Sequence, residues 1–249
     1  MKKFKLSSDF IEIDNIKLYR IQALININKI DIKIGDLGGY IEKESNLSHE
    51  GNAWVFNNAR VYDNAKVFGN ARVYDNARVY GDVKVFGDAR VCGNANVFGN
   101  AKVYGDARVC GNANVFGNAK VYGNAKVNDD AKVFGYVKVF GNVKVFGNAW
   151  VSGYAWVSGN AKVYGNANVL DNAWVCGNAK VYSNAKVNDD VRVSGDAEVF
   201  GDAKVSDYKF NAEDARVLYD EFKIKTPTHK IMIDEMFSQA YQTWLEFEL

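Results

Sequence analysis

Hydrophobic and polar positions follow a period of six over most of this 249-residue chain. From residue 51 to residue 206 the sequence divides into 26 consecutive blocks of six, with no insertion or deletion. The fifth place is Val in every block, and the third place is Ala in 22 of the 26. Residues two apart in an extended strand point to the same side of it. The pattern therefore predicts one short strand in each block, with Ala and Val facing inward and the residues beside them facing outward.

The first two places of each block predict a corner. Most blocks begin with Gly followed by Asn or Asp, as in "GNAKVYGNAKV". These residues tolerate the left-handed backbone angles that a tight corner needs. Pro, which would remove a donor from a strand ladder, is absent from 51–206. A helix is excluded because Gly-Asn in every block would break it.

A hexad with these spacings resembles the hexapeptide-repeat family, whose chains wind as a left-handed parallel β-helix of triangular section with three hexads per coil. The resemblance covers about 60% of the chain. Handedness comes from the resemblance, because the general crossover rule favours the right hand. The expected fold is an all-β solenoid of about nine triangular coils, roughly 40 Å long at the usual spacing of stacked strands.

The segment before the repeat narrows the resemblance. Residues 35–55, "GDLGGYIEKESNLSHEGNAWV", resemble the entry segment of the YdcK-like branch of hexapeptide proteins. Ile41 and Leu47 are six apart and form a degenerate first hexad, after which "SHEG" adds two residues. Members of this branch are often described as acyltransferases. The resemblance therefore implies a small N-terminal β segment and, as one possible activity, acyl transfer.

The flanks of the repeat predict two further units. Residues 1–50 form an N-terminal β cap and entry segment, with strands expected at "FIEID" and "IKLYRIQALI". An open solenoid end invites fibre growth unless it is covered. Residues 207–249 are expected to be helical, beginning at Asn211 and again near Lys230. This C-terminal segment either covers the last coil of its own chain or docks on a neighbouring subunit.

Charge and cysteines point to a cytoplasmic protein without a membrane partner. The net charge is +1, with a basic excess in 51–206 and an acidic excess in 207–249. The N-terminus lacks the apolar run of a signal peptide, and no stretch is long enough to span a membrane. The three cysteines, Cys92, Cys110 and Cys176, show no metal-type spacing. Cys92 and Cys110 stack on one face, but we expect reduced thiols rather than a redox pair.

Candidate chemistry is sparse. The two histidines, His49 and His229, lie outside the repeat. Under the acyltransferase interpretation His49, beside Glu50, is the general base; otherwise it is a turn histidine exposed to solvent. No catalytic triad, phosphate loop or metal spacing is present, so neither a metal nor a cofactor is expected. Acyl-CoA enters only as the substrate of the acyltransferase alternative.

The outward residues form columns, because three hexads per coil place residues eighteen apart above one another. One column is a basic ladder of Arg72, Arg90, Arg108, Lys126, Lys144 and Lys162. A second column stacks lysines from Lys66 to Lys138 beside rings from Phe68 to Phe140. These rows either stabilise the solenoid alone, through stacked rings covered by lysine stems, or bind a small anionic ligand. Nucleic acid is the weaker candidate because corner aspartates dilute the positive field.

The stretch "GNAWVSGYAWVSGN" departs from the consensus while keeping its inward Ala and Val. Around it, large rings replace cations or corner asparagines and small residues replace rings. The residues concerned include Tyr136, Trp150, Tyr154, Trp156, Ser158 and Trp174. Three interpretations remain: a subunit interface, a volume swap within the strand, or a ligand site. The less basic third face, with Asn96 and Asn114, also suits subunit packing. We expect self-association, with a trimer favoured over a dimer.

These observations predict a non-enzymatic oligomeric scaffold or binding protein, which presents basic and aromatic faces to a partner or a small anionic ligand. The alternative is a hexapeptide-type acyltransferase that uses acyl-CoA at subunit boundaries.

Overall fold

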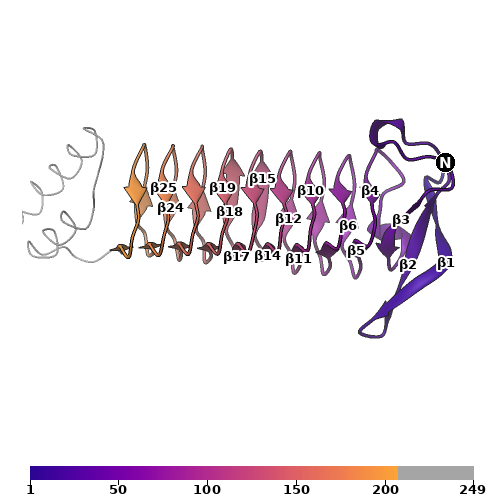
Figure 1. Cartoon of the computed structure of the whole chain (residues 1–249), viewed down its shortest axis with the longest axis horizontal. Coiled ribbons are helices and arrows are strands. Elements are labelled where there is room, and N and C mark those ends of the chain that lie inside the picture. Colours follow the sequence, from indigo (N-terminus) through magenta and orange to yellow (C-terminus); the bar gives the residue numbers. More distant parts are fainter. Residues whose placement is uncertain (207–249) are drawn as a thin grey trace, which may run out of the picture.

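A computed structural model describes residues 1–206 and shows the expected parallel β-solenoid (Figure 1). Each short strand pairs in parallel with the strand eighteen residues further on, as Trp54 and Val55 pair with Arg72 and Val73. The strands form three sheets, one on each face of about nine stacked coils. The helical segment predicted for 207–249 lies outside the described residues. No helix in 1–206 is long and apolar enough to cross a membrane.

Three sheets make the faces of the solenoid, and we name each by its outward residues. The nine-stranded sheet, the ladder face, consists of β4 (Trp54–Val55), β7 (Arg72–Val73), β10 (Arg90–Val91), β13 (Arg108–Val109), β16 (Lys126–Val127), β19 (Lys144–Val145), β22 (Lys162–Val163), β25 (Lys180–Val181) and β28 (Glu198–Val199). The eight-stranded sheet, the lysine face, consists of β6 (Lys66–Val67), β9 (Lys84–Val85), β12 (Lys102–Val103), β15 (Lys120–Gly123), β18 (Lys138–Gly141), β21 (Trp156–Val157), β24 (Trp174–Val175) and β27 (Arg192–Val193).

The twelve-stranded sheet, the mixed face, joins the cap to the repeat. It begins with three strands of the cap: β1 (Phe4–Ile13), β2 (Ile16–Ala23) and β3 (Leu37–Ile41). It continues with β5 (Arg60–Val61), β8 (Arg78–Val79), β11 (Asn96–Val97), β14 (Asn114–Gly117), β17 (Lys132–Gly135), β20 (Trp150–Val151), β23 (Asn168–Val169), β26 (Lys186–Val187) and β29 (Lys204–Val205). The cap also contains two short 3-10 turns, η1 (Asn28–Ile30) and η2 (Glu44–Asn46).

The core is the inward Ala and Val column, as predicted. From Ala53 to Val187 the third-place and fifth-place side chains within 51–187 are 0% or 1% exposed. Burial of each Val side chain contributes about 1.5 kcal/mol or more, so every coil is stabilised in the same way. In the first coil Trp54 lies on the predicted outward side, in register with Arg72, yet it is fully buried. That side chain is 0% exposed, because the cap covers it and the Phe4 ring lies edge-on with centroids 6.4 Å apart.

The cap satisfies the open edge of the first coil. In the ladder each backbone N–H donates to a carbonyl of the next coil, as Trp54 does to Ala71 at 3.1 Å. The first coil's carbonyls therefore need donors from elsewhere. The cap supplies them on all three faces: Lys3 Nζ to Ala53 O (2.8 Å), Tyr40 N–H to Ala59 O (2.8 Å) and Asn46 Nδ2 to Ala65 O (2.9 Å). The prediction that the N-terminal strands cover one solenoid end is confirmed.

The degenerate first hexad is also confirmed. Ile41 pairs with Val61 and Leu47 bridges to Val67, and both apolar side chains are buried. Both pairs are separated by twenty residues instead of eighteen. The two residues added by "SHEG" account for that difference, so the entry segment forms an incomplete coil above the first regular one.

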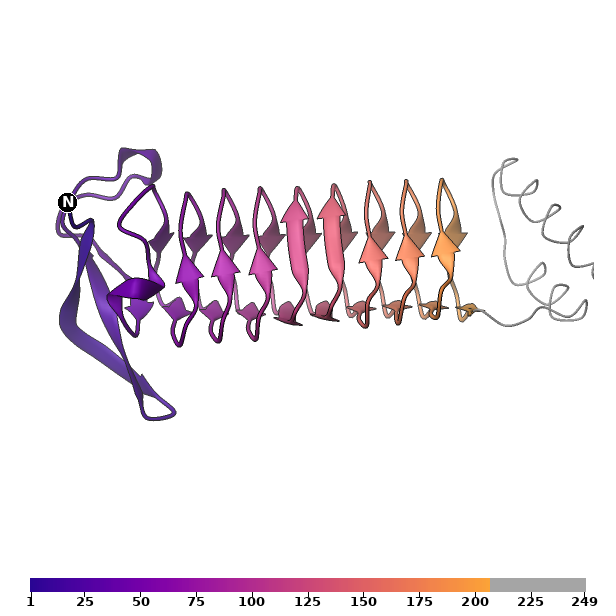
Figure 2. The same ribbon diagram turned by 180° about the vertical axis from the view of Figure 1, so that it is seen from behind.

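The β1–β2 hairpin extends sideways past the edge of the solenoid (Figure 2). Its strand β2 places Leu18 in a small buried cluster with Tyr40 and Tyr62. The Tyr62 ring begins the ring column of the mixed face, and Tyr80 stacks on it at 4.9 Å. The hairpin therefore anchors the cap to the outside of the solenoid as well as to its end.

Amide ladders run along the corners. In these ladders an Asn side chain donates through Nδ2 to the Oδ1 of the residue eighteen positions further on, at about 3 Å. The longest ladder runs through Asn124, Asn142, Asn160 and Asn178 to Asp196. Two others end in the same way, at Asp130 and Asp202. An ionised carboxylate accepts but cannot donate, so an aspartate ends the ladder.

Candidate ligand-binding faces

The basic ladder lies where the sequence places it, in register along the ladder face. The paired strands set Arg72 beside Arg90, Arg90 beside Arg108, and so on through Lys162 to Lys180. The coil repeat is 4.8 to 4.9 Å, measured between the stacked ring centroids of Phe146, Tyr164 and Tyr182. Within residues 1–206, the six cations from Arg72 to Lys162 make no ion pair with an acidic side chain.

The ladder ends in a different environment. Lys180 pairs with Glu198 at 2.7 Å, and the Tyr182 hydroxyl donates to the same carboxylate at 3.0 Å. Desolvation, together with this hydrogen bond, raises the pKa of Tyr182 to about 12. The free cations are therefore confined to the part of the column before Lys180.

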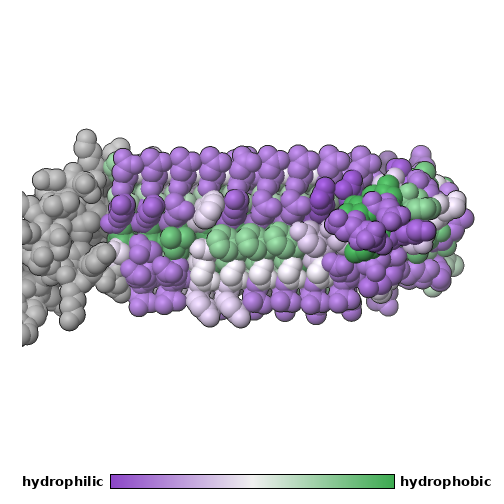
Figure 3. All heavy atoms as spheres, turned by 90° about the horizontal axis from the view of Figure 1, so that it is seen from below, coloured by the Kyte–Doolittle hydropathy of each residue, from purple (hydrophilic) through white to green (hydrophobic). Residues whose placement is uncertain are grey.

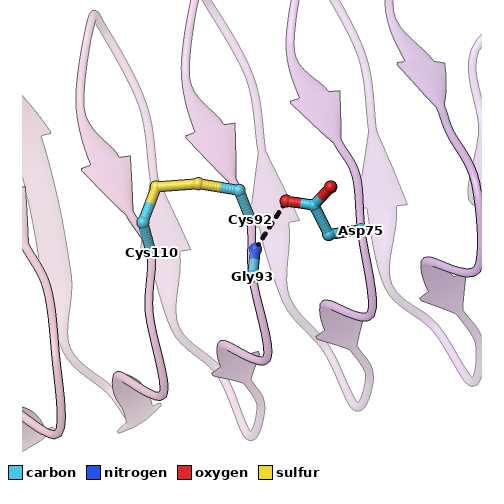
Figure 4. Close-up of a disulfide and its surroundings, with 4 residues drawn as sticks. All are labelled: Asp75, Cys92, Gly93 and Cys110. Atoms are coloured by element: carbon cyan, nitrogen blue, oxygen red, sulfur yellow. Dashed lines mark hydrogen bonds between the residues drawn. A yellow bond between two sulfur atoms is a disulfide. The ribbon is translucent and has the colours of Figure 1, made fainter.

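The ladder face also contains a disulfide, which corrects the prediction of reduced thiols. Cys92 and Cys110 occupy ring positions of adjacent coils and are bonded, with their Cα atoms 4.6 Å apart (Figure 4). The stacking of the two strands brings the side chains within bonding distance. In the preceding coil the Asp75 carboxylate accepts a hydrogen bond from the Gly93 N–H at 3.0 Å. Cys176, on the lysine face, is free and partly buried. The proposed cytoplasmic location stays a prediction.

The lysine face has the more regular array. Its first five strands carry a lysine row, and a ring wall follows two residues further along the chain in each coil. The lysine row is Lys66, Lys84, Lys102, Lys120 and Lys138, and the ring wall is Phe68, Phe86, Tyr104, Tyr122 and Phe140. Successive rings stack with centroids 4.8 to 5.0 Å apart and planes within 6° of parallel. Both rows end where Trp156 takes the lysine position and Ser158 the ring position.

The aromatic corner is the cluster of Tyr136, Trp150, Tyr154, Trp156 and Trp174, between the mixed face and the lysine face. Tyr136 and Tyr154 are the most exposed members, at 55% and 59%, and their rings stack at 5.0 Å. Trp156 and Trp174 stack at 5.1 Å. The structure therefore stacks the two tyrosines and the two tryptophans in separate pairs, and of the five rings only that of Trp156 is partly buried.

Two of the tryptophans also continue the ring columns of their faces. Trp150 lies edge-on to Phe134 at 6.1 Å, and Trp156 lies edge-on to Phe140 at 6.2 Å. In the next coil the ring position holds Ser152 or Ser158, which leaves room for an indole. Lys132 and Lys138 lie over these indoles at 4.7 and 4.1 Å from the ring centroids. This geometry agrees with the interpretation that a large ring and a small residue exchange places within the strand. The exposed rings of Tyr136, Tyr154 and Trp174 can still contact another molecule.

The mixed face carries a column of stacked rings between polar rows. Figure 3 shows an apolar band along the solenoid between polar rows. Its ring column runs from Tyr62 to Phe134, with centroids 4.7 to 5.1 Å apart. Asn96 donates to Asn114 at 3.3 Å, so the predicted neutral strip exists as a short amide ladder.

His49 belongs to the cap. Its ring stacks on Phe4 with centroids 4.4 Å apart, and its Nδ1 accepts a hydrogen bond from the Lys3 N–H at 3.2 Å. The carboxylate near its Nε2 is Glu44, at 3.6 Å, and not the predicted Glu50. Glu44 is paired in turn with Lys2 at 2.8 Å. The imidazole thus fixes the N-terminal strand against the first coil. His229 lies outside the described residues.

No group of three or more His, Cys, Asp or Glu side chains suited to a metal ion occurs in residues 1–206.

Two structural features were not predicted from the sequence. The buried Lys3, whose pKa desolvation lowers to about 8, donates to first-coil carbonyls. The amide ladders were readable from Asn and Asp at eighteen-residue spacing, but the direction of donation needed the structure.

Comparison with known proteins agrees with this geometry. Residues 71–87 match the family model described as the YdcK beta solenoid repeat. The protein is a β-solenoid, and this one segment of its repeat matches the family model. Among solved structures, this β-solenoid is similar to a Bacillus cereus protein described as a "putative acetyltransferase", with 13% sequence identity and a TM-score of 0.32. The match covers 70% of this chain and 88% of the other. A likeness at that score says nothing about activity. No curated protein matches the chain.

Proposed function

We propose that this β-solenoid is a non-enzymatic, self-associating scaffold that binds an anionic partner or small anionic ligand on its basic faces. The observation that carries the proposal is the basic ladder, whose six cations from Arg72 to Lys162 stand in register without an acidic partner in residues 1–206.

The electrostatics of the ladder favour an anion. Two unit charges one coil apart repel by about 1 kcal/mol even at the dielectric constant of water. Asn124 and Asn142, at the corner beside Lys126 and Lys144, are neutral and already bonded in an amide ladder. An anion laid along the column offsets repulsion between several cations at once. Binding of this kind weakens as salt is added, because the charges are near the surface.

The contacts of His49 support a structural role for it in this proposal. Its Nδ1 accepts a hydrogen bond from the Lys3 N–H, and its ring stacks on Phe4. Movement of the ring would therefore disturb the cap. The surrounding blocks follow the hexad period without an insertion that would build a pocket beside it. The acyltransferase alternative requires His49 to act at a subunit boundary, and it is tested directly by substitution.

The aromatic corner supplies the self-association surface in this proposal. Exposed Tyr136, Tyr154 and Trp174 form an apolar patch on an otherwise polar region, and Tyr and Trp are enriched where subunits meet. A trimer is our first expectation and a dimer the second.

The test combines binding with turnover. Calorimetric titration with inorganic triphosphate is expected to show binding that weakens in an Arg90→Gln, Arg108→Gln, Lys126→Gln variant. Acetyl-CoA is then incubated with amine acceptors in the presence of wild type or His49→Gln. Saturable acetyl transfer that disappears in His49→Gln overturns the scaffold proposal, and absence of anion binding by wild type overturns the role of the ladder.

A further inference from the structure

The lysine face carries an array that the basic ladder does not explain. Lys66, Lys84, Lys102 and Lys120 make no ion pair or hydrogen bond through their side chains within residues 1–206. The fifth member, Lys138, lies over the Trp156 ring. The paired strands hold all five in register, so the lysine row forms a straight line of positive charge parallel to the solenoid axis.

The ring wall beside this row is closed to stacking ligands. Each inner ring has a neighbour on both faces, with planes within 6° of parallel. Only the ring edges remain for a ligand, and the edge of an aromatic ring is its electropositive part. The hydroxyls of Tyr104 and Tyr122 carry their protons at neutral pH, as phenols do, and desolvation raises the pKa of both further. The wall therefore offers positive edges and hydroxyl donors to an oxygen-rich ligand.

The spacing of the array selects among linear polyanions. One lysine and one ring recur every 4.8 to 5.0 Å. In an extended chain of hexuronic acids each sugar advances the chain by a similar length and carries one carboxylate. We propose that the lysine face binds a linear polyuronate, laid along the solenoid axis with one sugar to each coil. This proposal rests on the proposed function, because it names the class of anionic ligand for a second basic face.

Other occupants fit less well. Single-stranded nucleic acid gains much of its affinity from bases stacked on free ring faces, which the ring wall does not offer. Duplex DNA advances ~3.4 Å per phosphate along each strand, which is out of step with the coils. An extended acidic peptide advances ~3.3 Å per residue, which is also out of step with the coils. A second copy of the lysine face would set like charges against each other.

The experiment measures how binding depends on ligand length and on each basic face. Fluorescence anisotropy with labelled oligogalacturonates, from dimer to octamer, is expected to show affinity that rises with length and levels off near the pentamer. Each Lys→Gln change in the row is expected to weaken binding about threefold, and the triple variant Lys84→Gln, Lys102→Gln, Lys120→Gln about 30-fold. The triple Lys→Arg variant at these positions keeps the charge and is expected to bind like wild type.

The matched control is Arg90→Gln, Arg108→Gln, Lys126→Gln on the ladder face, which removes the same charge from the same coils. Loss of polyuronate binding in the lysine-face variant alone supports the inference. Loss in the ladder-face variant alone overturns it while leaving the proposed function intact. Equal loss in both variants, affinity that does not depend on length, or tighter binding of oligothymidylate than of polyuronate also overturns it. Circular dichroism melts confirm that all variants fold, as expected for outward side chains.

Discussion

The corners of the solenoid allow a quantitative test of how tightly successive coils are stacked. Gly105 and Gly201 have nearly the same left-handed backbone, with φ of +70° and +68°. A Cβ added to Gly105 would lie 3.0 Å from the Gly123 nitrogen and 3.3 Å from its carbonyl oxygen, whereas a Cβ added to Gly201 meets no atom of residues 1–206 within 4 Å. The two substitutions to Ala therefore share a conformational cost and differ in the steric one.

The conformational cost for a non-glycine residue is about 1–2 kcal/mol, partly offset by the smaller entropy of the unfolded chain. The added Cβ of Gly105→Ala would press on the Gly123 backbone, so one of the two coils must shift. Overpacking of this kind costs about 1–3 kcal/mol more. We expect Gly201→Ala to lower the free energy of unfolding by about 1 kcal/mol. We expect Gly105→Ala to lower it by about 2–4 kcal/mol.

Gly105→Asp separates the steric term from the hydrogen-bonding term. Natural aspartates at equivalent corners accept a hydrogen bond from the next coil, as Asp75 does from the Gly93 N–H. That bond should recover about 1 kcal/mol relative to Gly105→Ala. Urea denaturation followed by circular dichroism ranks the three variants. If Gly105→Ala costs no more than Gly201→Ala, the steric reasoning is refuted; if Gly105→Asp is as costly as Gly105→Ala, the hydrogen-bond reasoning is refuted.

Three further predictions concern other features. Reduction of the Cys92–Cys110 disulfide, or Cys92→Ser, should lower the free energy of unfolding by about 3 kcal/mol, because the bond closes a loop between cysteines eighteen residues apart. Urea denaturation of wild type with and without a reductant measures this difference. An unchanged denaturation midpoint contradicts the prediction. Tyr182 has a folded-state pKa raised to about 12, so its contribution to stability is complete below pH ~10 and is lost as pH rises through ~12. The melting temperature of wild type should fall more steeply over that range than that of Tyr182→Phe, and parallel curves would refute the assignment. The double change Trp156→Lys, Trp174→Lys restores the cation of the repeat and should lower the oligomer mass measured by light scattering, whereas an unchanged mass excludes these tryptophans from the interface.

The sequence alone was sufficient for the repeat. An uninterrupted period of six determines which residues are inward, and three hexads per coil determine which residues stack. The columns of the basic ladder, the lysine row and the aromatic corner all follow from that arithmetic, as the pairing of Lys102 with Lys120 and of Trp156 with Trp174 shows. Such prediction succeeds because each coil contacts chiefly its neighbours, so local spacing and tertiary position carry the same information.

Features that do not follow from the six-residue repeat were decided by the tertiary structure. Trp54 occupies an outward place in the hexad yet is buried, because the cap brings Phe4 over it from fifty residues away. His49 lies beside Glu50 in the chain, but its ring meets Glu44 and Phe4. Stacking alone also left the state of Cys92 and Cys110 open, since bond formation depends on the distance and direction between two side chains. The sequence thus determined the repeating solenoid and its faces, whereas contacts between distant segments determined how the first coil is closed and what its histidine does.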